Sequence, residues 1–198
     1  MFVAVPLPER VVEDLEVFLA PRREGSPFRW TLPEQWHVTL AFLEHVPDRT
    51  LDDLVERLTR AARRRSPVTA RLTGGGAFPH VGKAKVLYAA LDTDRVELSR
   101  AATGARAAAG KAGIAVDGQR FRPHVTLGRT NRPVEATNWV RLLDAYGGPE
   151  WTIDELVLVA SHLGQGPRGR PRYELVERFS LGRAGSGPVP ADAPRRGR

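Results

Sequence analysis

The feature that most constrains the fold of this chain is a tetrapeptide that occurs twice. His-Val-Thr-Leu stands at residues 37–40 and again at residues 124–127. Each copy lies in a run where polar and apolar residues alternate, which is typical of a strand with one buried face. Because successive side chains of a strand point to opposite faces, the His and Thr of each copy share one face, and the Val and Leu share the other. The repeat therefore predicts two similar half-domains whose His and Thr side chains face each other across a cavity.

Periodicity in the remaining sequence predicts an α+β fold. Apolar residues recur at helical spacing after Pro8, Asp48 and Asp94, and a fourth helix is expected after Pro133. The predicted helices span residues 8–19, 48–58, 94–111 and 134–146. The predicted strands span residues 2–7, 27–31, 35–43, 68–73, 85–91, 119–129, 151–163 and 172–181. Because helices or glycine loops separate most of these strands, the pattern does not favour an all-β barrel.

The composition bounds the domain organisation and the location. A chain of 198 residues can form one domain, or one domain of two similar lobes, with a buried core. No apolar run approaches the ~18 residues that span a bilayer, and residues 1–6 lack the features of a signal peptide. Cysteine is absent, which excludes disulfides, a thiolate nucleophile and cysteine-based zinc sites. We therefore predict a cytoplasmic protein with a single bilobal domain at residues 1–182. Residues 183–198, rich in Pro, Gly and Arg, are predicted to form a disordered basic tail.

The charge is positive and is carried almost entirely by arginine. The net charge is +7, and Lys83, Lys85 and Lys111 are the only lysines among 30 basic residues. Codon bias in a GC-rich genome would produce this excess without any functional meaning. The functional interpretation is that arginine forks bind phosphate groups through paired hydrogen bonds. Because the tail holds four arginines and one aspartate, the body is only mildly basic, which suits a short anionic ligand better than a long duplex.

A glycine pair in the third predicted helix is not a nucleotide-binding loop. Gly104 and Gly110 enclose five residues, where the phosphate loop has four, and Ala112 stands where Ser or Thr binds magnesium. We interpret the segment as the end of a helix.

Two facing His-Thr pairs are suited to acid/base chemistry on a phosphodiester. Imidazole titrates near pH ~6.5, so at neutral pH one histidine can be a neutral base while the other is a charged acid. Cleavage of a phosphodiester needs a proton removed from the attacking oxygen and another delivered to the departing oxygen, on opposite sides of phosphorus. The threonine hydroxyls, a nearby arginine and backbone N–H groups could stabilise the nonbridging oxygens.

A metal site is the weaker interpretation of the same residues. A catalytic zinc ion usually has three protein ligands from His, Cys, Asp or Glu, and the nearest carboxylate to the first motif, Glu44, has the opposite strand parity to His37. The remaining histidines, His45, His80 and His162, belong to no paired motif and are expected on the surface or in loops. No metal and no cofactor is therefore predicted.

The two motifs and their surroundings resemble the 2H phosphoesterases, in particular the RNA 2′,3′-cyclic phosphodiesterases first described as 2′-5′ RNA ligases (LigT-like). The hallmark of that family is a pair of His-x-Thr-hydrophobic motifs, and the similarity runs in order over about residues 1 to 182. Glu44 departs from the glycine expected after the first motif. The similar segments are residues 2–8, 29–30 with 37–43, 76–79 with 86–88, 121–129, 157–161 and 173–174.

The resemblance implies a fold, a reaction and roles for four residues. The fold would be bilobal, with two pseudo-symmetric antiparallel sheets flanking a central cleft and helices outside. The reaction would be hydrolysis of a terminal 2′,3′-cyclic phosphate on RNA to a 2′-phosphomonoester. His37 would be the proton donor, His124 the proton acceptor, and Thr39 and Thr126 the ligands of the phosphate oxygens. The same pair would also join a cyclic phosphate end to a 5′-hydroxyl end in a reversible 2′-5′ RNA ligase reaction. The expected partner is RNA with a cyclic phosphate end, and tRNA halves, other RNA fragments and small cyclic nucleotides all remain candidate substrates. A monomer is expected because no exposed apolar helix stands out in the sequence.

Other candidate ligands lie close to the motifs. Arg129 is five residues past His124, so it would face away from the histidine on an unbroken strand, and a bend near Gly128 would bring it back as a phosphate ligand. Arg122 shares the parity of His124. Three aromatic residues, Phe121, Trp30 and Tyr88, could stack on a base or pack in the core. A non-catalytic RNA-end or nucleotide binder on the same fold is the alternative function, although binding alone needs no matched acid and base.

Overall fold

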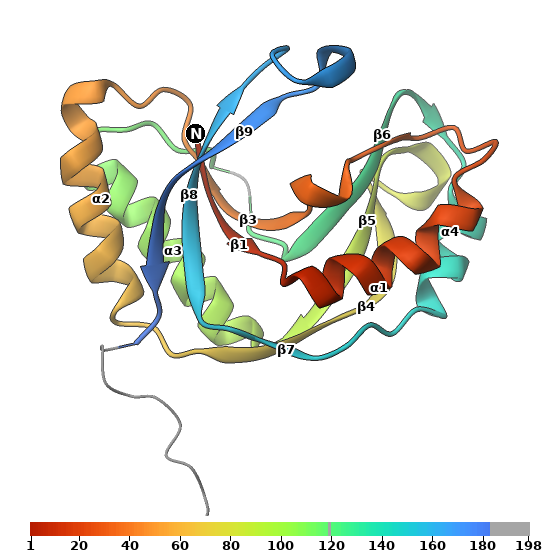
Figure 1. Cartoon of the computed structure of the whole chain (residues 1–198), viewed down its shortest axis with the longest axis horizontal. Coiled ribbons are helices and arrows are strands. Elements are labelled where there is room, and N and C mark those ends of the chain that lie inside the picture. The colour runs from red at the N-terminus through yellow and green to blue at the C-terminus, as the bar shows by residue number, and fades with distance from the viewer. Residues whose placement is uncertain (119, 183–198) are drawn as a thin grey trace, which may run out of the picture.

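The protein forms one large antiparallel sheet with helices along its outside (Figure 1). The structure is a computed structural model that describes residues 1–118 and 120–182. The α-helices of the described ranges are α1 (Glu9–Leu19), α2 (Asp48–Ala62), α3 (Arg95–Lys111) and α4 (Thr137–Asp144). The strands are β1 (Phe2–Pro6), β2 (Arg29–Trp30), β3 (His37–Phe42), β4 (Val68–Phe78), β5 (Ala84–Thr93), β6 (His124–Val134), β7 (Trp151–Ile153), β8 (Glu155–His162) and β9 (Arg172–Ser180). The predicted α+β class is confirmed.

The strand order divides the sheet into two similar halves. The order is β7-β4-β5-β6-β3-β1-β8-β9, with β2 paired to β6, so one half ends at β6 and the other begins at β3. Each of these two central strands begins with a copy of the repeated motif. The halves join where Val38 of β3 pairs with Val125 of β6. The two sheets expected from the sequence are therefore continuous with each other, because the second residues of the two motifs meet in one antiparallel pair.

The helices interlock the two halves. In Figure 1, α2 and α3 lie beside the half that contains β8 and β9, and α1 and α4 lie beside the other half. Because α3 follows β5 but packs against β3, it covers the half opposite to the strand that precedes it. Helix α1 reaches the segment after α4, where the Tyr146 hydroxyl donates to Asp14 at 2.6 Å. Each half of the sheet is therefore covered in part by a helix that follows or precedes strands of the other half.

Local sequence explains where the helices begin and how they pack. The side chain of Asp94 caps α3 by accepting hydrogen bonds from the backbone N–H groups of Val96 and Glu97, at 2.9 and 3.0 Å. The predicted end of α3 at Gly113 is confirmed, since this glycine has a φ of +76°. The buried face of α3 is nearly all alanine, which lets the helix approach its neighbours α2 and β3 closely.

Several predicted boundaries are wrong, and at the fourth helix and at β4 the reason is that strand pairing overrode the local sequence pattern. The fourth helix begins at Thr137 and not at residue 134, since β6 continues until Val134 pairs with Ala84. Strand β4 continues through its glycine run, where Gly75 and Gly76 leave room for neighbouring side chains. Residues 151–163 form two strands, and β6 begins at His124. The predicted tail at 183–198 lies outside the described residues.

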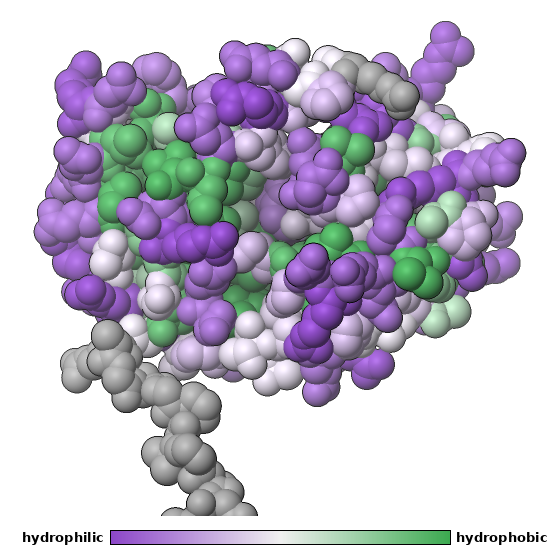
Figure 2. Space-filling view, in the orientation of Figure 1, coloured by the Kyte–Doolittle hydropathy of each residue, from purple (hydrophilic) through white to green (hydrophobic). Residues whose placement is uncertain are grey.

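Charged and polar side chains cover most of the visible face, and an apolar patch lies over the half that contains α2, β8 and β9 (Figure 2). Leu175 of β9 is 48% exposed on this half, whereas the leucines of β3 and β6 are buried. In the described ranges, no helix has the length and apolarity needed to cross a bilayer.

Candidate active site

The two motifs adopt the same local structure on the two central strands. The first six residues of β3 and of β6 have one burial pattern, in which the His and Thr side chains are partly accessible and the Val and Leu side chains are buried. This alternation is the one predicted from the sequence. It directs the apolar residues into the core and leaves both histidines and both threonines on the other face.

Each motif also contains a β-bulge at its leucine. In β6, Tyr88 of the neighbouring strand pairs with Thr126 and Leu87 pairs with Gly128, so Leu127 is an extra residue. In β3, Ala4 pairs with Thr39 and Val3 with Ala41, so Leu40 is the extra residue. A bulge shifts the alternation by one residue. The burial pattern records this shift, because two buried residues follow each other in both strands at this point.

The bulge decides the position of Arg129. On an unbroken strand this residue would face away from His124, but beyond Leu127 it returns to the face of the histidine. It pairs with Val86, two residues from the Tyr88 that pairs with Thr126. Its positive charge acts on His37, His124 and Tyr173 alike. Arg129 therefore lies on the same face as the candidate catalytic groups. The expected bend is the bulge at Leu127, one residue before Gly128.

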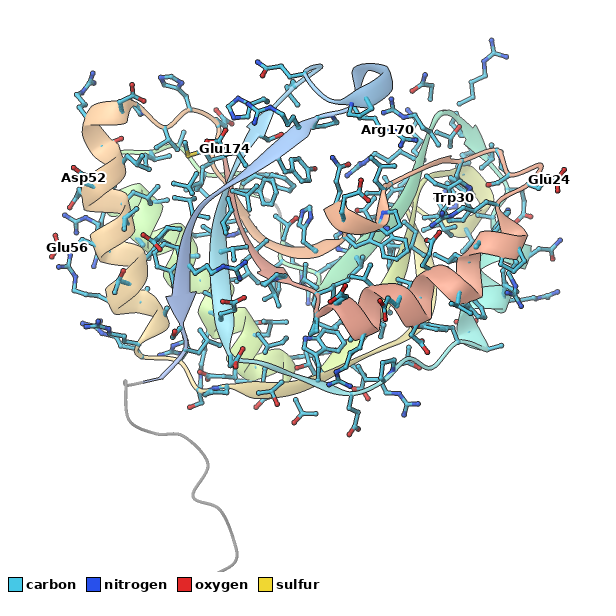
Figure 3. The ribbon with its side chains drawn as sticks, viewed as in Figure 1. Glu24, Trp30, Asp52, Glu56, Arg170 and Glu174 are labelled. Atoms are coloured by element: carbon cyan, nitrogen blue, oxygen red, sulfur yellow. The ribbon has the colours of Figure 1, made fainter. Side chains whose placement is uncertain are left out.

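Because of the same bulge, Trp30 lies on the face of the sheet opposite to the histidines. Trp30 pairs with Gly128, whose face is opposite to that of Arg129. Its ring packs against Trp139, with ring centroids 5.4 Å apart, and against Phe28. Figure 3 places it over the half of the sheet that carries α1 and α4. The suggested contact of Trp30 with RNA is thus not supported, because its register directs it into an aromatic cluster.

Both imidazoles are oriented by the same hydrogen bond. His37 Nδ1 lies 2.7 Å from the carbonyl oxygen of Gln35, and His124 Nδ1 lies 2.6 Å from the carbonyl oxygen of Arg122. A carbonyl can only accept, so each Nδ1 carries a proton and donates it. This fixes the tautomer of each ring and leaves Nε2 as the nitrogen that can exchange a proton with a ligand.

Burial changes the charge state of both histidines. It lowers the pKa of His37 from 6.5 to about 4, against the opposing hydrogen bond to Gln35, and the positive charges of His124 and Arg129 lower it further. Burial and Arg129 also lower the pKa of His124. Both rings are therefore mainly neutral at pH 7, whereas the sequence led us to expect one charged imidazole. A bound phosphate would restore the charge, because an anion favours imidazolium.

Two aromatic side chains pack against each imidazole. The ring of Phe2 stacks on His37 with centroids 4.6 Å apart, and Tyr173 meets His37 edge-on at 5.7 Å. Phe78 and Tyr88 stack on each other with centroids 4.5 Å apart, and their rings lie 5.0 and 5.2 Å from that of His124. These apolar walls account for the desolvation of both rings. We did not single out Phe2, Phe78 or Tyr173 from the sequence, since their proximity depends on strand pairing.

A cavity of about 500 Å³ adjoins His124. Thr39 of one half and His124 of the other both line it, together with Phe121 and Arg122 from the segment before β6. The Arg122 guanidinium also lies 5.9 Å from the centre of the Phe78 ring. The cavity therefore brings together one residue of each motif with two of the suggested RNA contacts, Phe121 and Arg122.

The remaining histidines lie elsewhere. His45 and His80 are exposed, and His162 faces Glu174 at 3.2 Å on the hairpin of β8 and β9. Within residues 1–118 and 120–182, no three His, Asp or Glu side chains are grouped so that they could bind a metal ion.

The fold, with its two paired strands that each begin with a His-x-Thr motif, is that of the two-histidine phosphoesterases. Residues 7–165 match the model of the 2′-5′ RNA ligase superfamily. The chain therefore belongs to this superfamily, as its motifs predicted.

Relatives and solved structures agree with this assignment. The chain is 35% identical over 190 residues to a Thermus thermophilus protein named RNA 2′,3′-cyclic phosphodiesterase, covering 91% of this chain and 89% of that protein. It is 30% identical to a protein of the same name from Archaeoglobus fulgidus, covering 90% and 98%. A crystal structure of a Thermus thermophilus protein matches with a TM-score of 0.74 and 33% identity over 91% of this chain and 96% of that chain. The structure of E. coli LigT with 3′-AMP matches with a TM-score of 0.73 and 25% identity over the same shares.

Proposed function

We propose that this protein hydrolyses the 2′,3′-cyclic phosphate at the end of an RNA to a 2′-phosphomonoester, without a metal ion. The observation that carries the proposal is the matched pair of imidazoles, each oriented by its own carbonyl, with Arg129 acting on both. A binding site alone would need no such pair of proton carriers. The names of the relatives support the substrate class.

The reaction requires two proton transfers on opposite sides of phosphorus. His124 Nε2 accepts a proton from the attacking water, whose oxygen forms the new bond to phosphorus. The bond between phosphorus and the 3′-oxygen breaks, and His37 Nε2 donates a proton to that oxygen. Each transfer contributes roughly 10²–10⁴-fold in rate. The assignment of donor and acceptor follows the family resemblance, and the lowered pKa of His37 makes its imidazolium the stronger acid.

The phosphate would be held by the groups that share the face of the histidines. Thr39 and Thr126 stand two residues after the histidines, so their hydroxyls can reach different oxygens of the same phosphate. Arg129 provides the positive charge for the nonbridging oxygens. Phe121 and Arg122 line the adjoining cavity and would contact the terminal nucleoside.

The proposal is tested by turnover of a nucleoside 2′,3′-cyclic phosphate in excess chelator. Full activity with release of only the 2′-phosphomonoester is expected. Activity lost in chelator and restored by a divalent metal would identify a metallohydrolase instead. Binding without turnover under any condition would identify the alternative, a non-catalytic RNA-end binder.

The same groups can also join two RNA ends. The 5′-hydroxyl of a second RNA then attacks phosphorus in place of water, His124 accepts its proton, and His37 protonates the departing 3′-oxygen, so that a 2′-5′ bond forms. Attack of the 3′-hydroxyl on that bond is the reverse step, in which the two histidines exchange roles. Formation of a 2′-5′ bond between a cyclic phosphate end and a 5′-hydroxyl end at high RNA concentration tests this.

A further inference from the structure

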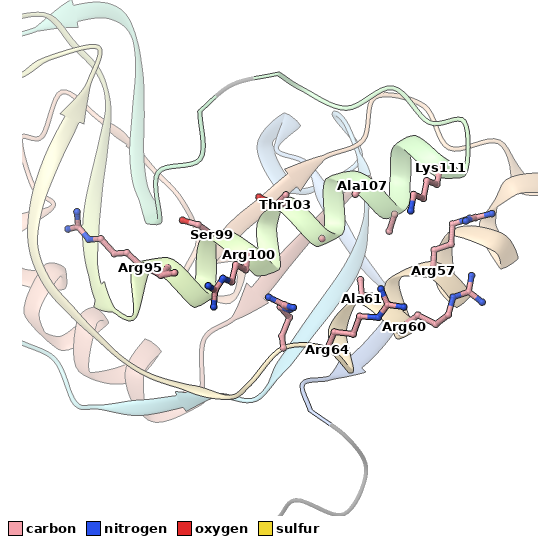
Figure 4. A pocket seen from close by; sticks show the side chains of 14 residues that line it. Arg57, Arg60, Ala61, Arg64, Arg95, Ser99, Arg100, Thr103, Ala107 and Lys111 are labelled. Carbon is pink, nitrogen blue, oxygen red and sulfur yellow. The ribbon is translucent and has the colours of Figure 1, made fainter.

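A basic groove runs between α2 and α3 on the outside of the molecule (Figure 4). Its volume is about 850 Å³, larger than the cavity beside His124. Six arginines and one lysine line it, and no carboxylate does. These residues take no part in the proposed chemistry, so the groove needs its own explanation.

The charge of the groove is only partly balanced by its surroundings. Arg57 and Arg60 pair with the carboxylates of Asp53 and Glu56 on the same helix, and Glu97 pairs with Arg65 and Arg100. The Arg60–Glu56 pair is exposed on both sides, and such pairs contribute only about 0–1 kcal/mol, so a phosphate can exchange with that carboxylate, whereas Glu97 is more buried and stays with Arg65 and Arg100. Arg64, Arg95 and Lys111 have no carboxylate partner among the described residues. The groove therefore keeps an excess of donors that attract an anion.

The floor of the groove admits a backbone at close range. Small residues, Ala61 of α2 with Gly104 and Ala107 of α3, line it between the long cationic side chains. Ser99 and Thr103 add hydroxyl groups along α3. Small residues below a double row of arginines suit a chain of phosphates and sugars, because each guanidinium can donate two hydrogen bonds to one phosphate.

Helix α3 contributes residues both to the groove and to the cavity beside His124. Arg106 lines the cavity with His124, while its neighbours on the helix, Thr103 and Ala107, line the groove. The two sites therefore lie on two sides of one helix, about 10–12 Å across. The nucleotides that precede the one in the cavity would have to pass around this helix to enter the groove.

We propose that the groove between α2 and α3 binds the phosphate backbone of single-stranded RNA upstream of the end that is cleaved. This rests on the proposed function for the identity of the substrate. A second copy of this basic chain is not a suitable occupant, because its net charge of +7 would repel the groove. The groove gives the enzyme a preference for oligonucleotides over mononucleotides.

The test removes two unpaired charges of the groove and compares a matched pair outside it. The groove variant is R64Q/K111Q, and the control is R49Q/R63Q, two exposed arginines of α2 and its end that do not line the groove. The binding probe is a labelled single-stranded RNA of about 12 nucleotides with a 3′-hydroxyl. The Kd of the groove variant should rise roughly tenfold, and the slope of log Kd against log salt should fall by about 1.4, or about 0.7 for each lost contact. The control should change neither.

Turnover separates this proposal from the proposed function. With an oligonucleotide 2′,3′-cyclic phosphate, the groove variant should show a KM raised roughly tenfold at unchanged kcat, and with a mononucleotide it should match the wild type. Equal changes in Kd and KM for the groove variant and the control variant would overturn the proposed RNA site in the groove. So would displacement of RNA by poly-glutamate as effectively as by unlabelled RNA. Absence of turnover in the wild type, with the binding difference intact, would overturn the proposed function alone.

Discussion

The two candidate catalytic histidines are alike in orientation and differ in environment. Each donates from Nδ1 to the carbonyl of the residue two positions earlier, so backbone geometry alone sets the direction of Nε2. The environments differ, because Phe2 stacks on His37 and Tyr173 contacts it edge-on, and His37 has the more strongly lowered pKa. One ring can thus specialise as donor and the other as acceptor on a pseudo-symmetric frame.

The roles of the two rings can be separated with a substrate that needs no acid. His37→Ala and His124→Ala should each remove most turnover of the natural cyclic phosphate, roughly 10²–10⁴-fold. In an analogue with sulfur at the departing 3′ position, the thiolate leaves without a proton. His37→Ala should recover most activity on this analogue, and His124→Ala should not. Recovery in His124→Ala alone would reverse the assignment. Initial rates on both substrates measure this, with circular dichroism as the control for folding.

The lowered pKa values of the histidines predict an acid-shifted pH profile. The fraction of charged acid falls as pH rises past its pKa, and the fraction of neutral base falls as pH drops below its own. Since kcat/KM reports the free enzyme, its bell should lie on the acid side of pH 6.5, where both pKa values fall. The bound phosphate raises the pKa of the acid, so the alkaline limb of kcat should lie at higher pH than that of kcat/KM. Both parameters are measured across pH. Alkaline limbs of kcat and kcat/KM at the same pH would contradict this prediction.

Arg129 should affect both binding and titration. It lowers the pKa of His37 and of His124, so Arg129→Gln should move the kcat/KM bell to higher pH and raise KM about tenfold. Arg132→Gln on the same strand is the matched control and should do neither. A change in KM with an unmoved bell would mean that Arg129 binds phosphate without acting on the histidines.

At the scale of elements, the sequence predicted where the strands lie and which residues share a face of each strand, but it did not predict which strands pair or in which register. Polar and apolar alternation was enough to place His37, Thr39, His124 and Thr126 on accessible faces. The bulges at Leu40 and Leu127 could not be read from the sequence, because a bulge exists only relative to the partner strand. The positions of Arg129 and Trp30 depended on that register, and so did the aromatic walls contributed by neighbouring strands.

The glycine run of β4 is an element-scale device that supports His124. A methyl group at Gly76 would overlap the ring and hydroxyl of Tyr88, which flanks His124. Gly76→Ala should therefore destabilise the protein by about 1–3 kcal/mol and displace Tyr88 from the histidine. Gly82→Ala is the control, because its added methyl would make only ordinary contacts with His80. Urea denaturation measures the stability.

A double-mutant cycle identifies the cause of the Gly76→Ala effect. If the methyl group acts through Tyr88, then Gly76→Ala should cost much less in a Tyr88→Ala background, where the clash is absent. Additive losses would show that the strain at Gly76 lies elsewhere.

At the scale of the whole molecule, the duplication visible in the sequence does not correspond to two independent units. The halves of the sheet were predictable from the repeated motif. Their interlocking was not, because it depends on which helix covers which half. Residues 1–94 contribute β1 with β3 and β4 with β5, but the strand order separates these pairs by β6. The same fragment lacks β8, which pairs with the other edge of β1, and α3, which covers β3.

Unfolding should therefore be a single cooperative transition, as expected for one domain at residues 1–182. Tryptophan fluorescence reports on four residues, of which Trp30 and Trp139 lie in the half that carries α1 and α4, Trp151 begins β7 and Trp36 directly precedes β3, while far-UV circular dichroism reports on all helices and strands. Both signals should follow the same urea curve, because neither half retains a complete core without the other. A fragment of residues 1–94 should remain unfolded in the absence of denaturant, and adding residues 95–182 as a second chain should restore structure and turnover together. Two separate transitions, or a folded fragment, would mean that the lobes are independent domains, and the two imidazoles would then be held in place only by a flexible interface.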